Sequence, residues 1–446
     1  MLQKNKGLVM RILILFLFFI IVLIYNLFGE QDFKISGNFQ LRTELDGRDF
    51  SDKTYPLSFT SMRTKIGLEK NLTKNISIFF QIRDSRLWGE AKNTIYNLKN
   101  LDLHQGYVQF DNILDEPMSV KAGRFEMQFR NGRYFSTNNF NYISRSWDGV
   151  LFSYDTKPFG INVFALTHSR SVDPYIGRAV PDTTQYPYPS KPEEGHNLYG
   201  FWSKFAFDKE HYLDIFSYYD FNRKRTSKGN YTSNRFMSGF YYKFSYDDFF
   251  TVLEGAYQGG EAGDQKNSSA PRIIQAFNVA GSLNYKIDDL TVGLNADVLS
   301  GTSEKDLNEG KYYRTFDATY QGKHSFYSGM DYFSDIQKST NNRGLNDLFI
   351  KITYDVKPWT FIFEGHNFTT NKAYRLQNNE KSRDLGNELY LITQVNLLKN
   401  ASLEWGKAVF IPGEVMKDVY DVKKNDGNYD RTDPSFWTYL MMRVSF

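Results

Sequence analysis

Basic side chains recur in the first third of the chain, within segments where polar and apolar residues alternate. The set consists of Arg42, Arg63, Lys65, Arg83 and Arg124, with the carboxylate of Glu126 two residues after the last of them. The guanidinium fork of arginine matches a carboxylate, and several cations along one low-dielectric passage concentrate anions there. These residues could therefore guide a sugar acid or a small organic anion.

A second basic set lies just downstream, in the connection at residues 129–147. It combines Arg130, Arg133 and Arg145 with the rings of Tyr134, Phe135, Phe140, Tyr142 and Trp147, and Asp148 follows directly. Arginine beside an aromatic ring can contact a sugar ring and its charge together. We expect this connection either to fold inward as a constriction or to pack as an extracellular loop on its neighbours.

The elements that carry these residues are predicted strands. Strand 75–87 illustrates the period of two, with Ile78, Phe80 and Ile82 on one face and Gln81 and Arg83 on the other. Eighteen such segments fill the chain, at 33–45, 57–70, 75–87, 101–111, 117–128, 148–155, 159–170, 196–207, 210–221, 232–246, 248–259, 271–286, 288–300, 344–355, 357–368, 386–398, 400–411 and 434–446.

The connections between these segments alternate between short and long. Turns of a few residues, such as 71–74, 208–209 and 399, are each followed by a longer spacer. This rhythm is typical of an antiparallel barrel in an outer membrane, with short periplasmic turns and long extracellular loops. Closure is required because an open sheet edge cannot be satisfied in lipid. We therefore predict an all-β transmembrane barrel of about 18 strands, although one alternating strand alone would fit a soluble sandwich equally well.

The barrel frame predicts where the basic residues lie. If the apolar face meets lipid, the five cations point inward, and four of them, Arg42, Arg63, Arg83 and Arg124, stand about seven to nine residues above the periplasmic end of their strands. Lipid-facing arginine at mid-membrane costs about 2–4 kcal/mol, which also favours the lumen. Neutralisation by Glu44, Glu69, Glu126 and Asp155 is the alternative, and it would leave a salt-bridged wall with weak selectivity.

The termini and the composition support this localisation. Lys4, Lys6 and Arg11 precede an apolar run at 12–25, so residues 1–29 are predicted to be a signal peptide and residues 30–446 a single barrel domain. Mean hydropathy is −0.52 with 17% aromatic residues, which excludes a bundle of membrane helices. The terminal Phe446 resembles the signal read by outer-membrane assembly machinery. The near-neutral mature chain gives no indication of nucleic-acid binding.

Enzymatic and metal-binding interpretations find little support. The chain has no cysteine and no G-x-S-x-G nucleophile motif near its six histidines. The acidic stretch at 421–433 lacks the final glutamate of a helical calcium loop, so we expect a solvated turn there. No metal or cofactor is predicted. The long spacer at 301–343 is rich in aromatic residues and is expected to form a lid or partial plug.

Several short motifs resemble the alginate export family of outer-membrane barrels. They lie at Leu103–Val108, Ala122–Glu126, Asn131–Arg133, Asn138–Phe140, Arg145–Val150, His324–Phe326, Gly329–Asp331 and Gly344–Leu348. The resemblance implies an Arg-lined lumen that exports an anionic polysaccharide such as alginate, with possible periplasmic export partners. Three readings stay open: an anion-conducting channel in outer-membrane lipid, a non-selective diffusion porin, and an outer-membrane enzyme or adhesin.

Overall fold

The computed structural model describes residues 33–91, 100–170, 195–222, 225–226, 229–230, 233–263, 272–423 and 432–446. The predicted signal peptide at 1–29 and most of the acidic stretch at 421–433 lie outside these residues. None of the helices in the described part of the chain is long and apolar enough to cross a membrane.

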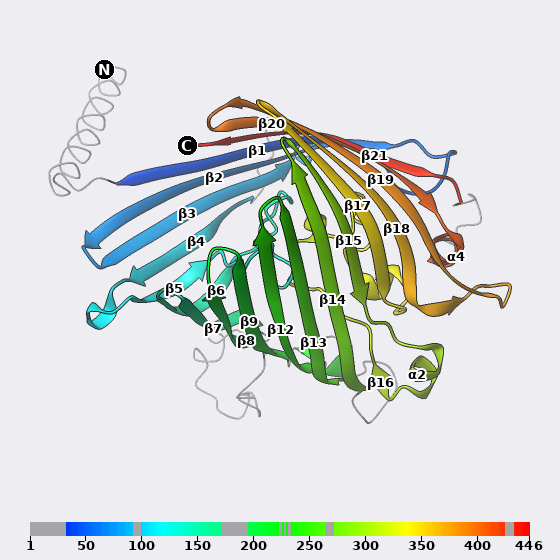
Figure 1. Cartoon of the computed structure of the whole chain (residues 1–446), viewed down its shortest axis with the longest axis horizontal. Helices are drawn as coiled ribbons and strands as arrows, with labels where there is room; N and C mark the ends of the chain where they lie inside the picture. The colour runs from blue at the N-terminus through cyan, green and yellow to red at the C-terminus, as the bar shows by residue number, and fades with distance from the viewer. Residues whose placement is uncertain are drawn as a thin grey trace, which may run out of the picture.

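Eighteen strands of the described chain close into one antiparallel barrel (Figure 1). They are β1 (Lys34–Gly47), β2 (Leu57–Thr73), β3 (Ile76–Leu87), β4 (Leu101–Phe110), β5 (Met118–Phe125), β6 (Trp147–Asp155), β7 (Phe159–Arg170), β8 (Gly195–Ala206), β9 (His211–Asn222), β12 (Ser233–Tyr246), β13 (Phe249–Ala262), β14 (Arg272–Ile287), β15 (Leu290–Leu299), β17 (Leu345–Val356), β18 (Trp359–Arg375), β19 (Lys381–Leu398), β20 (Ala401–Pro412) and β21 (Ser435–Ser445).

The first and last strands complete the ring. β1 pairs with β2 on one side and with β21 on the other, where Leu41 lies opposite Met442. Three two-residue strands complete the described strands: β16 (Tyr312–Tyr313) runs parallel to β14, and β10 (Arg225–Thr226) pairs with β11 (Gly229–Asn230). The predicted fold class and the number of strands are confirmed.

One predicted loop is partly strand. The connection expected at 369–385 is occupied by the ends of β18 and β19, which extend to Arg375 and back from Lys381. The pairing slips between Phe368 and Tyr374. Polar residues occupy both faces above this slip, so the apolar alternation that marks a strand is missing there.

The outer face of the barrel is apolar. On β14, Phe277, Val279 and Leu283 are exposed, whereas Ala276 and Ala280, on the other side of the same strand, are buried. Alternation of this kind is expected when one face meets lipid and the other faces the lumen.

Two long connections fold into the lumen. Phe135 of the 129–147 connection contacts the rings of Phe164 on β7 and Tyr218 on β9, and Tyr320 of the 301–343 connection stacks on Phe135. The described α-helices are short and belong to the long connections: α2 (Glu304–Glu309), α3 (Ile336–Ser339) and α4 (Glu414–Lys423). The interior of the barrel is therefore partly filled, with an aromatic cluster at its centre.

Candidate channel interior

Four of the predicted lumen cations lie together on the inner wall. Arg42, Arg63, Lys65 and Arg83 project from β1, β2 and β3, and all are buried. The pairing brings them together, because Arg63 lies opposite Gln40, and Lys65 lies opposite Arg83. We call Arg42, Arg63, Lys65 and Arg83 the basic wall.

The basic wall holds the 129–147 connection by its backbone. Arg42 donates to the carbonyl of Phe140 at 2.7 Å. Arg63 donates to the carbonyls of Asn139 and Asn141 at 3.0 and 2.7 Å, and Arg83 donates to that of Ser144 at 2.6 Å. Guanidinium groups therefore satisfy carbonyls that would otherwise be buried without partners. The spacing of the arginines in the sequence did not predict that they would bind the backbone of this connection.

Carboxylates neutralise most of the wall. Arg42 pairs with Glu44 at 2.7 Å, Lys65 with Glu126 at 2.6 Å and Arg83 with Asp102 at 2.7 Å.

Burial and ionic contacts have opposite effects on the pKa of Glu126, the partner of Lys65. Burial raises the pKa of its carboxyl, but the hydrogen bond from His104 and the contact with Lys65 outweigh burial and hold the pKa below its ordinary value. The carboxylate stays charged beside Lys65.

Arg63 is the exception. Among the described residues, no carboxylate lies within 4 Å of its guanidinium, which instead contacts carbonyl oxygens and the amide oxygens of Asn38 and Gln40. Its Nε is buried without a hydrogen-bond partner.

Arg124 and Asp148 do not line the lumen. Their strand neighbours Phe125 and Trp147 are buried in the interior aromatic cluster, so the alternation turns Arg124 and Asp148 outward. The two side chains form a bidentate pair with distances of 2.6 and 2.7 Å and are about half exposed. The expected lumen position of Arg124 and loop position of Asp148 are corrected accordingly.

Two arginines of the 129–147 connection reach the opposite wall. Arg130 forms a bidentate pair with Asp214 of β9. Arg133 pairs with Asp297 of β15 at 3.1 Å and lies 3.3 Å from Glu254 of β13. The connection thus spans the lumen. Its carbonyls contact the basic wall, and its cations contact the carboxylates of Asp214, Glu254 and Asp297, which we call the acidic wall.

Arg145 joins the two inward connections. It donates to the carbonyls of Tyr320 and Thr319 at 2.5 and 3.1 Å. The Ser136 amide also donates to Tyr320, and the Gly322 amide donates to Gly132. These bonds make one roof from the 129–147 connection and residues 319–328.

A chamber of about 1050 Å³ lies under this roof. Its lining comes mainly from the periplasmic halves of the strands. Five cations and five carboxylates contribute: Arg63, Lys65, Arg133, Lys351 and Arg443, with Glu126, Glu254, Asp297, Glu364 and Glu404. Lys351 pairs with Glu364 at 2.7 Å and Arg443 with Glu404 at 2.9 Å. With the pairs of Lys65 and Arg133, every acidic group of the lining faces a cation, and Arg63 alone among these cations has no carboxylate.

Sequence reasoning did not single out Arg443 and Glu404. A usable signal existed, because Arg443 follows Trp437, Tyr439 and Met441 on the buried face of β21.

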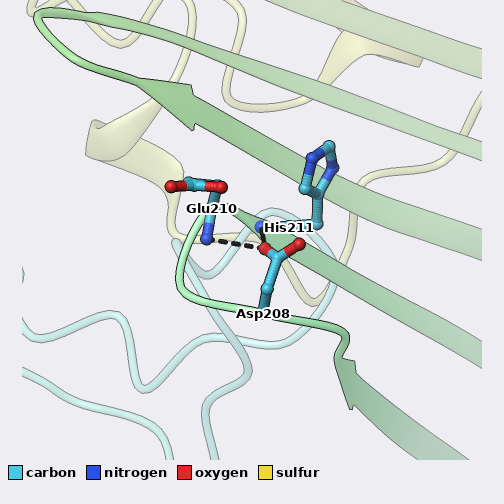
Figure 2. A group of neighbouring side chains, drawn as sticks. All are labelled: Asp208, Glu210 and His211. Carbon is cyan, nitrogen blue, oxygen red and sulfur yellow. Dashed lines mark hydrogen bonds between the residues drawn. The ribbon is translucent and has the colours of Figure 1, made fainter.

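Within the described part of the chain, one group of potential metal ligands lies on a periplasmic turn. Ligand atoms of Asp208, Glu210 and His211 lie within 4.8 Å of one another. Figure 2 shows the Asp208 carboxylate accepting from the backbone amides of Glu210 and His211, at 2.8 and 2.6 Å. The Nδ1 atom of His211 is hydrogen-bonded to Tyr242. The arrangement is that of a capped tight turn.

The closed barrel of 18 strands has the fold of solved outer-membrane porins. Residues 33–430 match the family model described as alginate export, and the chain belongs to that family. No curated protein matches the sequence.

Three solved structures illustrate the likeness in fold. Pseudomonas aeruginosa OccK8 (OprE) is 11% identical, with 93% of this chain and 98% of that chain covered and a TM-score of 0.54. OpdO from the same species is 10% identical, with coverage of 93% and 97% and a TM-score of 0.56. A BenF-like porin from Pseudomonas fluorescens Pf-5 is 8% identical, with coverage of 93% and 98% and a TM-score of 0.55.

Proposed function

We propose that this outer-membrane channel passes small hydrophilic solutes through the chamber and prefers anions weakly. One observation carries the proposal: Arg63 is the single chamber-lining cation without a carboxylate partner among the described residues. A guanidinium whose charge no carboxylate neutralises attracts anions in a low-dielectric passage.

The preference is weak because the lining as a whole is balanced, with five cations and five carboxylates. Lys65, Arg133, Lys351 and Arg443 each face an acidic group. Paired charges on opposite walls produce a field across the chamber, with little net attraction for either sign of ion. The same balance favours the second candidate, a non-selective diffusion porin.

Export of an acidic polysaccharide is the proposal that family membership supports. A polymer would have to cross the roof, where the 129–147 connection spans the lumen between the basic and acidic walls. We therefore propose that small solutes pass with the roof in place, and that polymer passage needs the roof to move.

Block of the channel current by added sugars distinguishes the candidate functions. The protein is placed in a planar bilayer, and glucuronate or glucose is added at equal concentration, because the two sugars differ only at the C6 carboxylate. We expect glucuronate to reduce the current more strongly than glucose. Equal effects of the two sugars would leave the non-selective porin, and block by oligouronates but not by glucuronate would favour polymer export.

A further inference from the structure

The apolar outer band of the barrel is lower on one side. On β5 the first outward charge, Arg124, stands six residues above Met118, and on β6 Asp148 stands seven above Asp155. On β13 the first outward charge is Glu261, twelve residues above Phe249. At about 3.3 Å per residue and a tilt of about 40°, these heights are about 15–18 Å and about 30 Å.

A row of polar side chains marks the top of the low side. Arg124 lies opposite Asp148, Asp148 opposite Thr167, and Thr167 opposite Asn197. Thr167 donates to Asn197 at 3.0 Å, so the row is hydrogen-bonded in pairs on the outer surface. The polar row therefore crosses four neighbouring strands, β5 to β8.

The apolar band on β5 and β6 is shorter than the hydrocarbon layer of a bilayer. The apolar band of such barrels is about 25 Å tall, so the row on β5 and β6 lies within the depth of the hydrocarbon, whereas β13 covers it fully. Thinning the bilayer on one side costs a fraction of a kcal/mol per Å.

Lys407 on β20 also points outward, but its long side chain can reach the membrane interface, and its ammonium lies 3.2 Å from the Trp405 ring centroid. Arg124, by contrast, is held at its height by the bidentate pair with Asp148.

An apolar hollow adjoins the polar row. It has a volume of about 630 Å³ and is lined by residues of β6, β7 and β8, including Phe152, Val163, Tyr199 and Phe201. Small Ala165 lies between Val150 and Tyr199 in the pairing, so large side chains rise beside a shallow floor. A surface with ridges next to a hollow can interlock with the same surface on another molecule.

We propose that the outer face of β5–β8 is where a second copy of this chain packs. A second copy has the same short apolar band on its β5–β8 face. When the two faces pack together, apolar side chains contact apolar side chains, and the two polar rows lie at the same height. Both signs of charge are present in Arg124 and Asp148, which makes the surface complementary to itself. An anionic lipid headgroup fits less well, because Asp148 already neutralises Arg124.

The test uses single cysteines, since the chain has none of its own. Ala165→Cys places a spin label on the proposed interface, and Ala296→Cys places one on the exposed outer face of β15 as a matched control. Both proteins are reconstituted in lipid vesicles, and heat-modifiable migration on gels checks that each is folded. Electron–electron double resonance then measures distances between molecules, with dilution by unlabelled protein as a check for random proximity.

We expect a defined intermolecular distance for Ala165→Cys that is shorter than any for Ala296→Cys, and a native mass of two or more copies. A monomeric mass with no defined distance at either position would overturn the proposal. A shorter distance at Ala296→Cys would do the same, because the copies would then pack through the opposite wall. A native complex that contains a different protein in place of a second copy would also refute it.

Discussion

The Phe140 ring lies flat on the His324 imidazole, with ring centroids 3.4 Å apart and an interplanar angle of 13°. Phe140 belongs to the 129–147 connection and His324 to the 301–343 connection. The Arg42 guanidinium carbon lies over the Phe140 ring, 4.2 Å from its centroid. The stack thus links the basic wall to both halves of the roof, in the part of the lumen that a solute must pass.

Loss of this stack is expected to loosen the roof. Phe140→Leu removes the aromatic contact with His324 while the backbone carbonyl of residue 140 remains available to Arg42. We predict a larger and noisier single-channel conductance. Ile143→Ala, at an exposed position of the same connection, serves as the control. An unchanged conductance for Phe140→Leu would mean that the stack does not restrict the pore.

The Arg130–Asp214 pair is expected to contribute strongly to stability. Asp214 is fully buried and also accepts from the Trp202 indole at 2.6 Å. Arg130→Met leaves this buried carboxylate without its partly exposed cation, and a buried acceptor that loses its partner costs about 1–3 kcal/mol. Urea unfolding from lipid vesicles measures the loss. Lys305→Ala removes the exposed Lys305–Glu309 pair and should cost under about 1 kcal/mol; equal effects would contradict the burial argument.

Glu126 is expected to stabilise the protein down to acid pH. Its folded pKa lies below the ordinary value, so its contribution is present above the unfolded pKa of about 4.3 and is lost as pH falls through the lower folded pKa. The difference in unfolding free energy between wild type and Glu126→Gln should therefore be constant from pH 7 to about pH 5 and shrink below that. A difference that disappears above pH 5 would contradict the predicted direction.

The C-terminus is expected to matter for assembly. Phe446 exchanges backbone hydrogen bonds with Gly37 of β1 at 2.9 and 3.1 Å, where the ring closes, and its aromatic side chain resembles a signal for the assembly machinery. Phe446→Ala keeps the backbone bonds. We predict less protein in the outer membrane at equal expression, measured by fractionation, with unchanged stability of the folded fraction. Normal insertion would remove the proposed role of the ring.

The barrel was predictable because a period of two and alternating connection lengths follow directly from a membrane-spanning sheet. The inward position of Arg42, Arg63, Lys65 and Arg83 follows from the same period.

Arg124 was misplaced because β5 carries charge on both faces, with Lys121 on one and Arg124 on the other. Phe125 decides the orientation, since its side chain is buried in the interior cluster, which combines inward strand residues with residues of the long connections, such as Phe135 and Tyr320. The bonds from the basic wall to Phe140, Asn141 and Ser144 were equally hidden, because residue spacing does not reveal where a long connection folds.

The most direct test is the reversal potential under a KCl gradient for wild type, Arg63→Gln and Arg86→Gln. Glutamine removes the charge of residue 63 but keeps an N–H donor, and Arg86 is an outward, exposed arginine paired with Asp84. We predict mild anion selectivity that disappears in Arg63→Gln, with unchanged single-channel conductance, and persists in Arg86→Gln. Selectivity that is absent in wild type, or unaffected by Arg63→Gln, would contradict the role assigned to Arg63.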